Sequence, residues 1–290
     1  MKDKIIGSIL LIVTSIIWGC SFVVMKDVTN TLTPNVLLFV RFSLASLFMF
    51  VIFFKQIKTI KLSTIKYGLI IGVFTYIAYI IQTYGLVYTT PSKNAFLTTV
   101  YTAMVPFLVW LIYKKRPDSY NFLAAFICFI GIGFVSLKGD LSMNIGDLLT
   151  IICGLFYALQ IIFTKKSLEV LSPVNLSFIS ISTTAILALL SSILFENITI
   201  VDRIGNSYLQ IIYLALISTV LTQLFQSIGQ HKVSECYASI LMSLESVFGV
   251  IASVLFYHEV ISIQMYIGFI LIFIGIIISN TKLSFLRRKL

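Results

Sequence analysis

Long apolar segments follow one another along almost the whole chain, separated by short polar or charged stretches. A bilayer core about 30 Å thick takes roughly 20 residues of helix, and about 17 to 25 are common. The pattern predicts ten membrane-spanning helices, over residues 4–25, 35–54, 67–87, 94–113, 119–137, 146–164, 173–195, 208–229, 235–257 and 262–281. Little of the chain is left over for a soluble domain. The sequence therefore predicts an all-α membrane protein.

Two of the predicted helices carry polar residues at helical spacing. An offset of 144 positions relates the two sets, which are Thr75, Tyr79, Gln82 and Gly85 in the third helix and Thr219, Gln223, Gln226 and Gly229 in the eighth. In hydrocarbon, an amide or hydroxyl without a partner costs several kcal/mol. We therefore expect a polar cavity between these two helices, with both glycines allowing close approach of the backbone. Hydrogen bonding between helices, without a substrate, is the alternative explanation.

These polar stripes belong to a longer internal repeat. Residues 18–26 align with residues 157–165 at an offset of 139, and residues 129–132 align with residues 273–276 at an offset of 144. The matches include Gln, Lys, Pro and Gly, whereas matches among apolar residues alone arise by chance. Because five is odd, the second unit enters the membrane from the other side. The repeat predicts two inverted five-helix units, in domains 1–140 and 141–290, around a central cavity.

Composition and charge agree with a membrane protein. The chain is 59% hydrophobic and 11% charged, compared with about 25% charged residues in ordinary soluble domains. With a cytoplasmic amino terminus, only four basic residues of the loops lie on the outer side: Lys26, Lys93, Lys138 and Arg203. The other basic loop residues lie on the inner side, which is the bias that orients membrane proteins. This predicts an inner-membrane protein with both termini in the cytoplasm, and explains the net charge of +10 without a nucleic acid partner.

Cysteine and histidine offer no sign of a metal or a cofactor. Cys20, Cys128, Cys153 and Cys236 form no CxxC pair and have no neighbouring histidine cluster. We expect neither disulfides nor a metal site, and no cofactor.

Several short motifs, in this order, resemble those of the EamA-type carriers of the drug/metabolite transporter superfamily. They are Trp18-Gly19-x-Ser21-Phe22, Arg41-Phe42, Asn94-Ala95-Phe96-Leu97-Thr98 followed by Val105-Pro106, and Leu244-Glu245-Ser246-Val247-Phe248 with Glu259. The resemblance covers essentially the whole chain. It implies ten helices around a cavity lined mostly by the first, third, fourth, sixth, eighth and ninth, and export of small metabolites such as amino acids. Ser246 stands where family members often have Pro, which leaves open whether the ninth helix is kinked.

Two charged residues lie within predicted helices. Glu245 is about eleven residues into its helix, roughly 16 Å deep, and Arg41 is about 10 Å deep from the other side. Charged groups at such depth are commonly functional. Glu245 is a candidate to bind a substrate ammonium group or to titrate, and Arg41 to bind a substrate carboxylate. The alternatives are a helix-to-helix contact and a charge pair between the two residues.

The remaining candidate substrate-binding residues are neutral. Besides Glu245 and the two stripes, which contribute Thr75, Tyr79, Gln82, Thr219, Gln223 and Gln226, the candidates are Trp18, Phe22, Thr98, Tyr101, Tyr157, Gln160 and Met242. Trp18, Phe22 and Tyr157 are candidates for aromatic cavity walls, although Trp and Tyr also gather at membrane interfaces. Met242 serves equally well in core packing. Lys26 and Lys165 lie at helix ends, where extension of the side chain to the membrane surface is the ordinary explanation.

Together these features predict a transporter of small molecules in a lipid bilayer, secondary-active or facilitative, that works by alternating access as a monomer or homodimer. Export of small metabolites such as amino acids is the first expectation. Multidrug or cationic compound efflux and metabolite uptake are the alternatives. An integral membrane enzyme is the rival from another class, but such chemistry needs several converging acids, histidines or metal ligands. The chain has one deep acid, so we expect no enzyme.

Overall fold

The computed structural model of the chain is all-helical in the part that it describes, apart from one isolated bridge between Leu137 and Met143. It describes residues 2–114, 116–137, 143–196, 207–233 and 235–281. Within these residues, nine helical segments are long and apolar enough to cross a membrane, and 263–278 is a shorter apolar helix. The predicted class, an all-α membrane protein, is confirmed.

The helices lie close to the ranges that the sequence predicts. They are α1 (Lys2–Val28), α2 (Pro34–Ile52), α3 (Phe54–Ile57), α4 (Leu62–Tyr88), α5 (Pro91–Thr98), α6 (Tyr101–Tyr113), α7 (Ser119–Ser136), α8 (Ile145–Ser167), α9 (Pro173–Phe195), α10 (Tyr208–Ile212), the π-helix η2 (Tyr213–Leu221), α11 (Thr222–Lys232), α12 (Glu235–Ser243), α13 (Glu245–Phe256) and α14 (Ile263–Thr281). The expected boundary between residues 140 and 141 lies outside the described residues, as do Lys138 and Arg203 and the side chain of Cys236.

Local sequence explains where several helices begin. Pro34, Pro91 and Pro173 stand at the first turn of α2, α5 and α9, where the missing N–H of proline costs nothing. The Asp118 carboxylate accepts from the Asn121 N–H at 3.1 Å and so caps α7. These signals fix the starts of the spans to within a few residues.

Three spans are not continuous α-helices, which the hydrophobic pattern did not predict. The fourth is interrupted at residues 99–100 between α5 and α6, and the ninth at Leu244 between α12 and α13. At both points the helix tightens, because the Val100 N–H bonds to the Leu97 carbonyl and the Leu244 N–H to the Leu241 carbonyl, each at 3.4 Å. The ninth span thus breaks without the proline that Ser246 replaces. The eighth span instead widens into η2.

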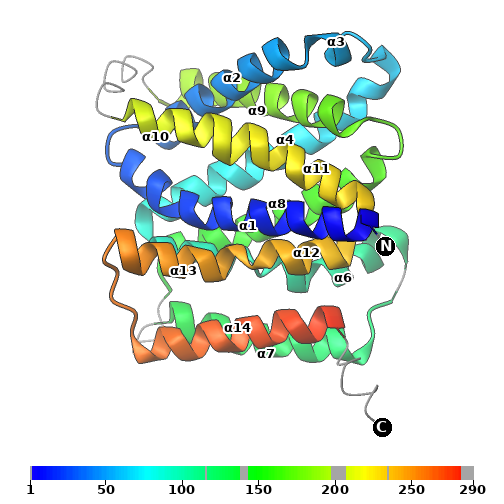
Figure 1. The fold of residues 1–290 in the computed structure, drawn as a ribbon. Helices are drawn as coiled ribbons and strands as arrows, with labels where there is room; N and C mark the ends of the chain where they lie inside the picture. Colours follow the sequence, from blue (N-terminus) through cyan, green and yellow to red (C-terminus); the bar gives the residue numbers. More distant parts are fainter. Residues whose placement is uncertain (1, 115, 138–142, 197–206, 234, 282–290) are drawn as a thin grey trace.

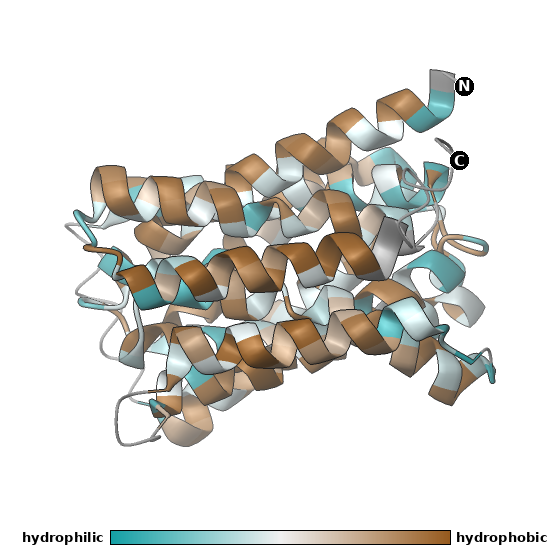
Figure 2. Cartoon of the chain, turned by 90° about the horizontal axis from the view of Figure 1, so that it is seen from below, coloured by the Kyte–Doolittle hydropathy of each residue, from teal (hydrophilic) through white to brown (hydrophobic). Residues whose placement is uncertain are grey.

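The helices run back and forth between two ends of the molecule (Figure 1). At the terminal end α1 begins and α14 finishes, and at the opposite end α1 finishes and α2 begins. Helices α7 and α14 pack on each other and form a layer along one side of the bundle. Apolar residues occupy the middle of the helices, and polar residues gather toward the two ends (Figure 2). This distribution suits a bilayer around the middle of the bundle.

Glycines bring the first helix of each repeat against the third helix of the other. A Cβ on Gly85 of α4 would lie 3.0 Å from the Gly146 carbonyl oxygen of α8, and one on Gly229 of α11 would lie 3.1 Å from the Gly7 carbonyl oxygen of α1. Offsets of 144 and 139 positions relate the members of these two contacts. The expected close approach of the backbone at Gly85 and Gly229 is therefore confirmed, and neither glycine lines the pocket described next.

Candidate binding pocket

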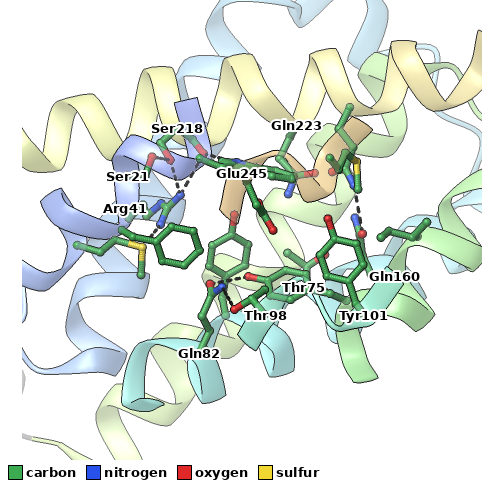
Figure 3. Close-up of a pocket in the computed structure, with 18 residues that line it drawn as sticks. Ser21, Arg41, Thr75, Gln82, Thr98, Tyr101, Gln160, Ser218, Gln223 and Glu245 are labelled. Carbon is green, nitrogen blue, oxygen red and sulfur yellow. Dashed lines mark hydrogen bonds between the residues drawn. The ribbon is translucent and has the colours of Figure 1, made fainter. Parts of the chain in front are cut away.

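A pocket lies among the broken spans and the helices around them, with an empty volume of about 540 Å³ that includes its open side. Aromatic, amide and hydroxyl side chains line it together with two charged ones: Trp18, Ser21, Phe22, Met25, Arg41, Thr75, Tyr79, Gln82, Thr98, Tyr101, Tyr157, Gln160, Ile161, Ser218, Gln223, Gln226, Met242 and Glu245. Figure 3 shows these side chains converging from several helices.

Most of the lining residues form pairs that the repeat relates. With offsets of 139 or 144 positions, the pairs are Trp18 with Tyr157, Ser21 with Gln160, Phe22 with Ile161, Tyr79 with Gln223, Gln82 with Gln226, Thr98 with Met242, and Tyr101 with Glu245. Both repeats thus contribute corresponding positions to one pocket. The residue types mostly differ within a pair, so the two walls are chemically unlike.

Amide groups join the pocket walls. The Gln82 amide donates to the Thr98 hydroxyl at 3.0 Å and accepts from the Tyr157 hydroxyl at 2.8 Å. Its repeat counterpart, Gln226, donates to the Gln160 side-chain oxygen at 3.3 Å. Some polar side chains of the two stripes therefore form hydrogen bonds between helices, as the alternative explanation held. The same side chains also line the pocket. These bonds hold the amides in place at its surface.

Arg41 projects from α2 and is only 1% exposed. Its Nε donates to the Thr219 hydroxyl at 2.7 Å, and one terminal nitrogen donates to the Ser218 carbonyl and hydroxyl oxygens at 3.0 and 3.1 Å. The other terminal nitrogen lies 3.2 Å from the Met25 sulfur, and the guanidinium stands 4.9 Å from the centre of the Tyr79 ring. The π-helical turn of η2 thus supplies most of the acceptors around this buried cation.

Glu245 begins α13, directly after the break in the ninth span, and is 5% exposed. In Figure 3 it reaches into the pocket between Ser218 and Gln223. Tyr101, its counterpart in the repeat, begins α6 directly after the break in the fourth span. The Tyr101 hydroxyl is buried and makes no hydrogen bond of ordinary geometry among the described residues, and it interacts with the Glu245 carboxyl group. The two broken helices therefore aim corresponding residues into the same space.

The considered charge pair between Arg41 and Glu245 does not form. The two ion pairs among the described residues join Lys93 to Asp147 and Lys232 to Asp3. Arg41 instead donates to neutral acceptors on η2. The hydrophobic pattern predicts an ordinary α-helix at this place. The Ser218 carbonyl also accepts from the Trp18 indole and the Thr222 hydroxyl, so Arg41 shares this acceptor with α1 and α11.

The pocket contains every candidate binding residue named from the sequence except Thr219, which lies behind it and binds Arg41. Whether these residues contact a substrate stays a prediction. Sequence reasoning missed Ser21, Met25, Ile161 and Ser218. The repeat could have found two of them, because Ser21 corresponds to Gln160 and Ile161 to Phe22. No comparable signal marks Met25 or Ser218.

Two lysines at helix ends bind backbone carbonyls. The Lys26 ammonium of α1 donates to the carbonyls of Leu86, Val87 and Thr89, at 2.6, 3.0 and 2.9 Å, at the end of α4. The Lys165 ammonium of α8 donates likewise to Gln230, His231 and Val233, at 2.9, 3.3 and 2.9 Å, at the end of α11. All members of the two sets correspond in the repeat. The lysines therefore satisfy free carbonyls at helix ends, and side-chain extension to the membrane surface does not describe them.

The two ends of the molecule differ in their acidic contacts. At the opposite end, buried Asp147 accepts from the Thr89 hydroxyl and pairs with Lys93 at 3.1 Å. At the terminal end, the corresponding residues are Ser8, Val233 and Tyr237, and the Ser8 hydroxyl reaches the Tyr237 hydroxyl at 3.5 Å. The opposite end thus has the ion pair with a buried acid, whereas the ion pair at the terminal end joins Lys232 to the exposed Asp3.

Among the described residues, no group of three or more His, Cys, Asp or Glu side chains is placed to hold a metal ion. The pocket offers one carboxylate, aromatic rings, amides and hydroxyls. These groups suit recognition of a small molecule by hydrogen bonds, ring contacts and charge.

Several known proteins are similar to this chain. An uncharacterized transporter of Archaeoglobus fulgidus is 29% identical over 277 residues, which cover 94% of this chain and 85% of the relative. The uncharacterized transporter YoaV of Bacillus subtilis is 21% identical over 286 residues, or 96% and 97% of the two chains. One protein known from a crystal structure shares the fold, with a TM-score of 0.71 at 15% identity, over 95% of this chain and 96% of that one.

A multi-pass helical bundle around a polar pocket suits a membrane transporter. The model of the EamA-like transporter family matches residues 5–137 and again residues 144–281. The chain belongs to the EamA-like transporter family, within the drug/metabolite transporter superfamily. The resemblance inferred from the motifs is confirmed, and the protein belongs to a family of transporters rather than of enzymes. Two matches along one chain also support the internal repeat.

Proposed function

We propose that the pocket is the transport site, and that small metabolites such as amino acids are exported through it by alternating access. The observation that carries this proposal is the pairing of corresponding residues, such as Gln82 with Gln226 and Tyr101 with Glu245, around one pocket. Inverted halves that share a site between them are a common design of secondary transporters.

The ten-helix organisation follows from the same reasoning. Residues 1–140 and 141–290 form two five-helix units, and the odd number of spans gives them opposite orientations in the membrane. The alternation of helix directions in Figure 1 supports this arrangement. The basic residues of the loops place the terminal end, and with it both chain termini, in the cytoplasm.

Efflux of cationic compounds is the second candidate function. Trp18, Phe22, Tyr79, Tyr101 and Tyr157 give the pocket aromatic walls, and Glu245 is a carboxylate among them. Aromatic faces and an acid together attract organic cations. This candidate uses the same pocket and the same alternating access, and differs only in the compound carried.

Replacement of one pocket amide tests the proposed transport site. Gln226→Leu removes an amide that makes a single hydrogen bond, to Gln160 at 3.3 Å, so the fold should tolerate it. A screen of thermal stability with amino acids, nucleobases, sugars and cationic dyes first identifies a ligand. In proteoliposomes, counterflow of that ligand should fall about tenfold in the variant, because a pocket hydrogen bond to the substrate is lost.

The matched control is Gln264→Leu, since Gln264 lies exposed on α14 and binds the Leu137 carbonyl at 3.0 Å, away from the pocket. This variant should keep the counterflow of the unaltered protein. Unchanged transport by folded Gln226→Leu protein, and by the double variant with Gln82→Leu, would remove the pocket from the transport path.

A further inference from the structure

Glu245 has no cationic partner among the residues that the structure describes. Its side chain is buried and lines the pocket, while the described ion pairs are those of Asp147 and Asp3. A carboxylate removed from water is stabilised only when a charge partner and hydrogen bonds replace the water. The charged form of this acid therefore has no complement within the described chain.

Arg41 is unsuited to receive a substrate carboxylate in this conformation. All three of its nitrogens have acceptors, on Thr219, Ser218 and Met25, at 2.7 to 3.2 Å. Bidentate recognition of a carboxylate needs two parallel N–H groups that point at the ligand. The donors of Arg41 are already bonded to residues of η2 and α1. This cation therefore holds the pocket-lining helices together and does not face a ligand.

Neutral oxygen atoms line the pocket together with Glu245. Tyr101 is 2% exposed, and its hydroxyl interacts with the Glu245 carboxyl group but makes no hydrogen bond of ordinary geometry among the described residues. The Gln223 amide lines the same pocket (Figure 3). An ammonium group has three donors and no acceptor, which matches a carboxylate together with neutral oxygens.

The aromatic walls favour the same ligand group. Tyr79 and Tyr157 meet edge to face with ring centres 5.6 Å apart, and Tyr101 lies 6.4 Å from Tyr157. Cations are attracted to the faces of such rings. The Arg41 guanidinium already lies over the Tyr79 ring at 4.9 Å from its centre, so Tyr101 and Tyr157 are the rings left for a ligand ammonium group.

We propose that Glu245 and Tyr101 form a binding site for a substrate ammonium group, and that the carried molecules are amines, with or without a carboxylate. This rests on the proposed transport function of the pocket and specifies the substrate class. The two residues hold corresponding places in the repeat, each at the start of the helix that follows a break. The breaks therefore direct the two side chains of the ammonium site into the pocket.

Three compounds with closely similar branched carbon chains distinguish the role of each charged group. They are 3-methylbutylamine, which carries only an amine, 4-methylpentanoate, which carries only a carboxylate, and leucine, which carries both. The full-length protein in detergent is examined by thermal unfolding and by calorimetric titration with each compound. The amine and leucine should bind and raise the unfolding temperature. The acid without an amino group should bind at least about tenfold more weakly, because it lacks the charge that Glu245 complements.

Two variants assign the effect to the site. Glu245→Gln should weaken binding of 3-methylbutylamine about tenfold or more, and Tyr101→Phe about threefold to tenfold, because hydrogen bonds to charged groups are lost. Glu169→Gln is the matched control, since Glu169 is exposed after the end of α8, and it should bind the amine like the unaltered protein. Size-exclusion chromatography and unliganded unfolding temperatures confirm that the variants are folded.

Three results would overturn the ammonium site: no binding of the amine to the unaltered protein, equal binding of 4-methylpentanoate, or undiminished amine binding by folded Glu245→Gln protein. The transport function is judged separately by the Gln226→Leu counterflow. If a compound without an amino group is transported and its flux depends on Gln226, the transport site is supported and the ammonium proposal is refuted.

Discussion

Arg41 is a buried cation surrounded by neutral groups. Its partners come from the π-helical turn and from Met25, and its guanidinium also lies against Tyr79. Removing one partner from a buried charged hydrogen bond costs more than the bond contributes, because the remaining group stays out of water. The geometry of the planar guanidinium also matters, because its donors are spread over three nitrogens, whereas an ammonium has all its donors on one nitrogen. Arg41 therefore holds α2 against η2.

Arg41→Lys should destabilise the protein although the charge is kept. The lysine loses the bonds to at least one of Thr219 and Ser218, at a cost of about 2 kcal/mol. Thermal unfolding in detergent, followed by tryptophan fluorescence, should show a lower midpoint than for the unaltered protein. Glu245→Gln provides the contrast, because Glu245 has no ion pair in the described structure to lose. A midpoint for Arg41→Lys equal to that of the unaltered protein would contradict the bracing role.

At the scale of elements, the sequence predicted the spans well and their interruptions poorly. Hydropathy and prolines such as Pro34 and Pro173 located the helices, because the length of a span is set by the bilayer and a proline start by local geometry. The breaks at residues 99–100 and at Leu244, and the widening in η2, left no such signal. They depend on contacts with other helices, such as that of Arg41 with the Ser218 carbonyl.

The sequence likewise predicted most of the pocket-lining residues and missed others. The polar stripes and the repeat identified Gln82, Gln226 and most other lining residues, because buried polar groups in lipid-length segments are rare enough to be informative. Ser218 and Met25 were not found, since serine and methionine occur commonly in helices of every kind. Which acceptors Arg41 would bind could not be predicted, because this depends on the widened turn rather than on sequence spacing.

The pair of α7 and α14 allows a prediction with a control in the same helix. A Cβ on Gly131 would stand 2.9 Å from the Gly268 carbonyl oxygen and 3.0 Å from the Ile272 nitrogen, whereas one on Gly133 meets only the Leu137 side chain at 3.6 Å. Gly131→Ala should therefore lower stability by about 1 to 3 kcal/mol through overpacking. Gly133→Ala should be neutral or slightly stabilising, because alanine favours the helix.

Thermal unfolding of both variants in the same detergent measures this difference. Equal midpoints for Gly131→Ala and Gly133→Ala would show that α7 and α14 separate without cost, against the close contact of their backbones.

At the scale of the whole molecule, the two ends are built from corresponding positions with different chemistry. Asp147 joins α8 to Lys93 and Thr89 at the opposite end, whereas Ser8 and Tyr237 make one long contact at the terminal end. Breaking a buried ion pair by removing one partner costs about 3 to 5 kcal/mol. We therefore expect the opposite end to be the more firmly closed of the two in the unliganded protein.

Asp147→Ala should loosen the opposite end. Amide hydrogen exchange of residues 89–94 and 145–150 should become faster, because both Lys93 and Thr89 lose their partner. Ser8→Ala makes the corresponding change at the terminal end, where only the 3.5 Å contact to Tyr237 and a bond to the Lys4 carbonyl are lost. It should leave exchange nearly unchanged. Equal acceleration at the two ends would refute the asymmetry.

The lysine contacts at the helix ends have a mechanical consequence. Lys26 ties α1 to α4 at the opposite end, and Lys165 ties α8 to α11 at the terminal end. At the other end of each helix pair, no side-chain hydrogen bond between the two helices is present among the described residues. We therefore expect each helix pair to separate more readily at its untied end than at its tied end. Because one tie lies within each half of the chain and the two ties lie at opposite ends of the molecule, the halves should loosen at opposite ends.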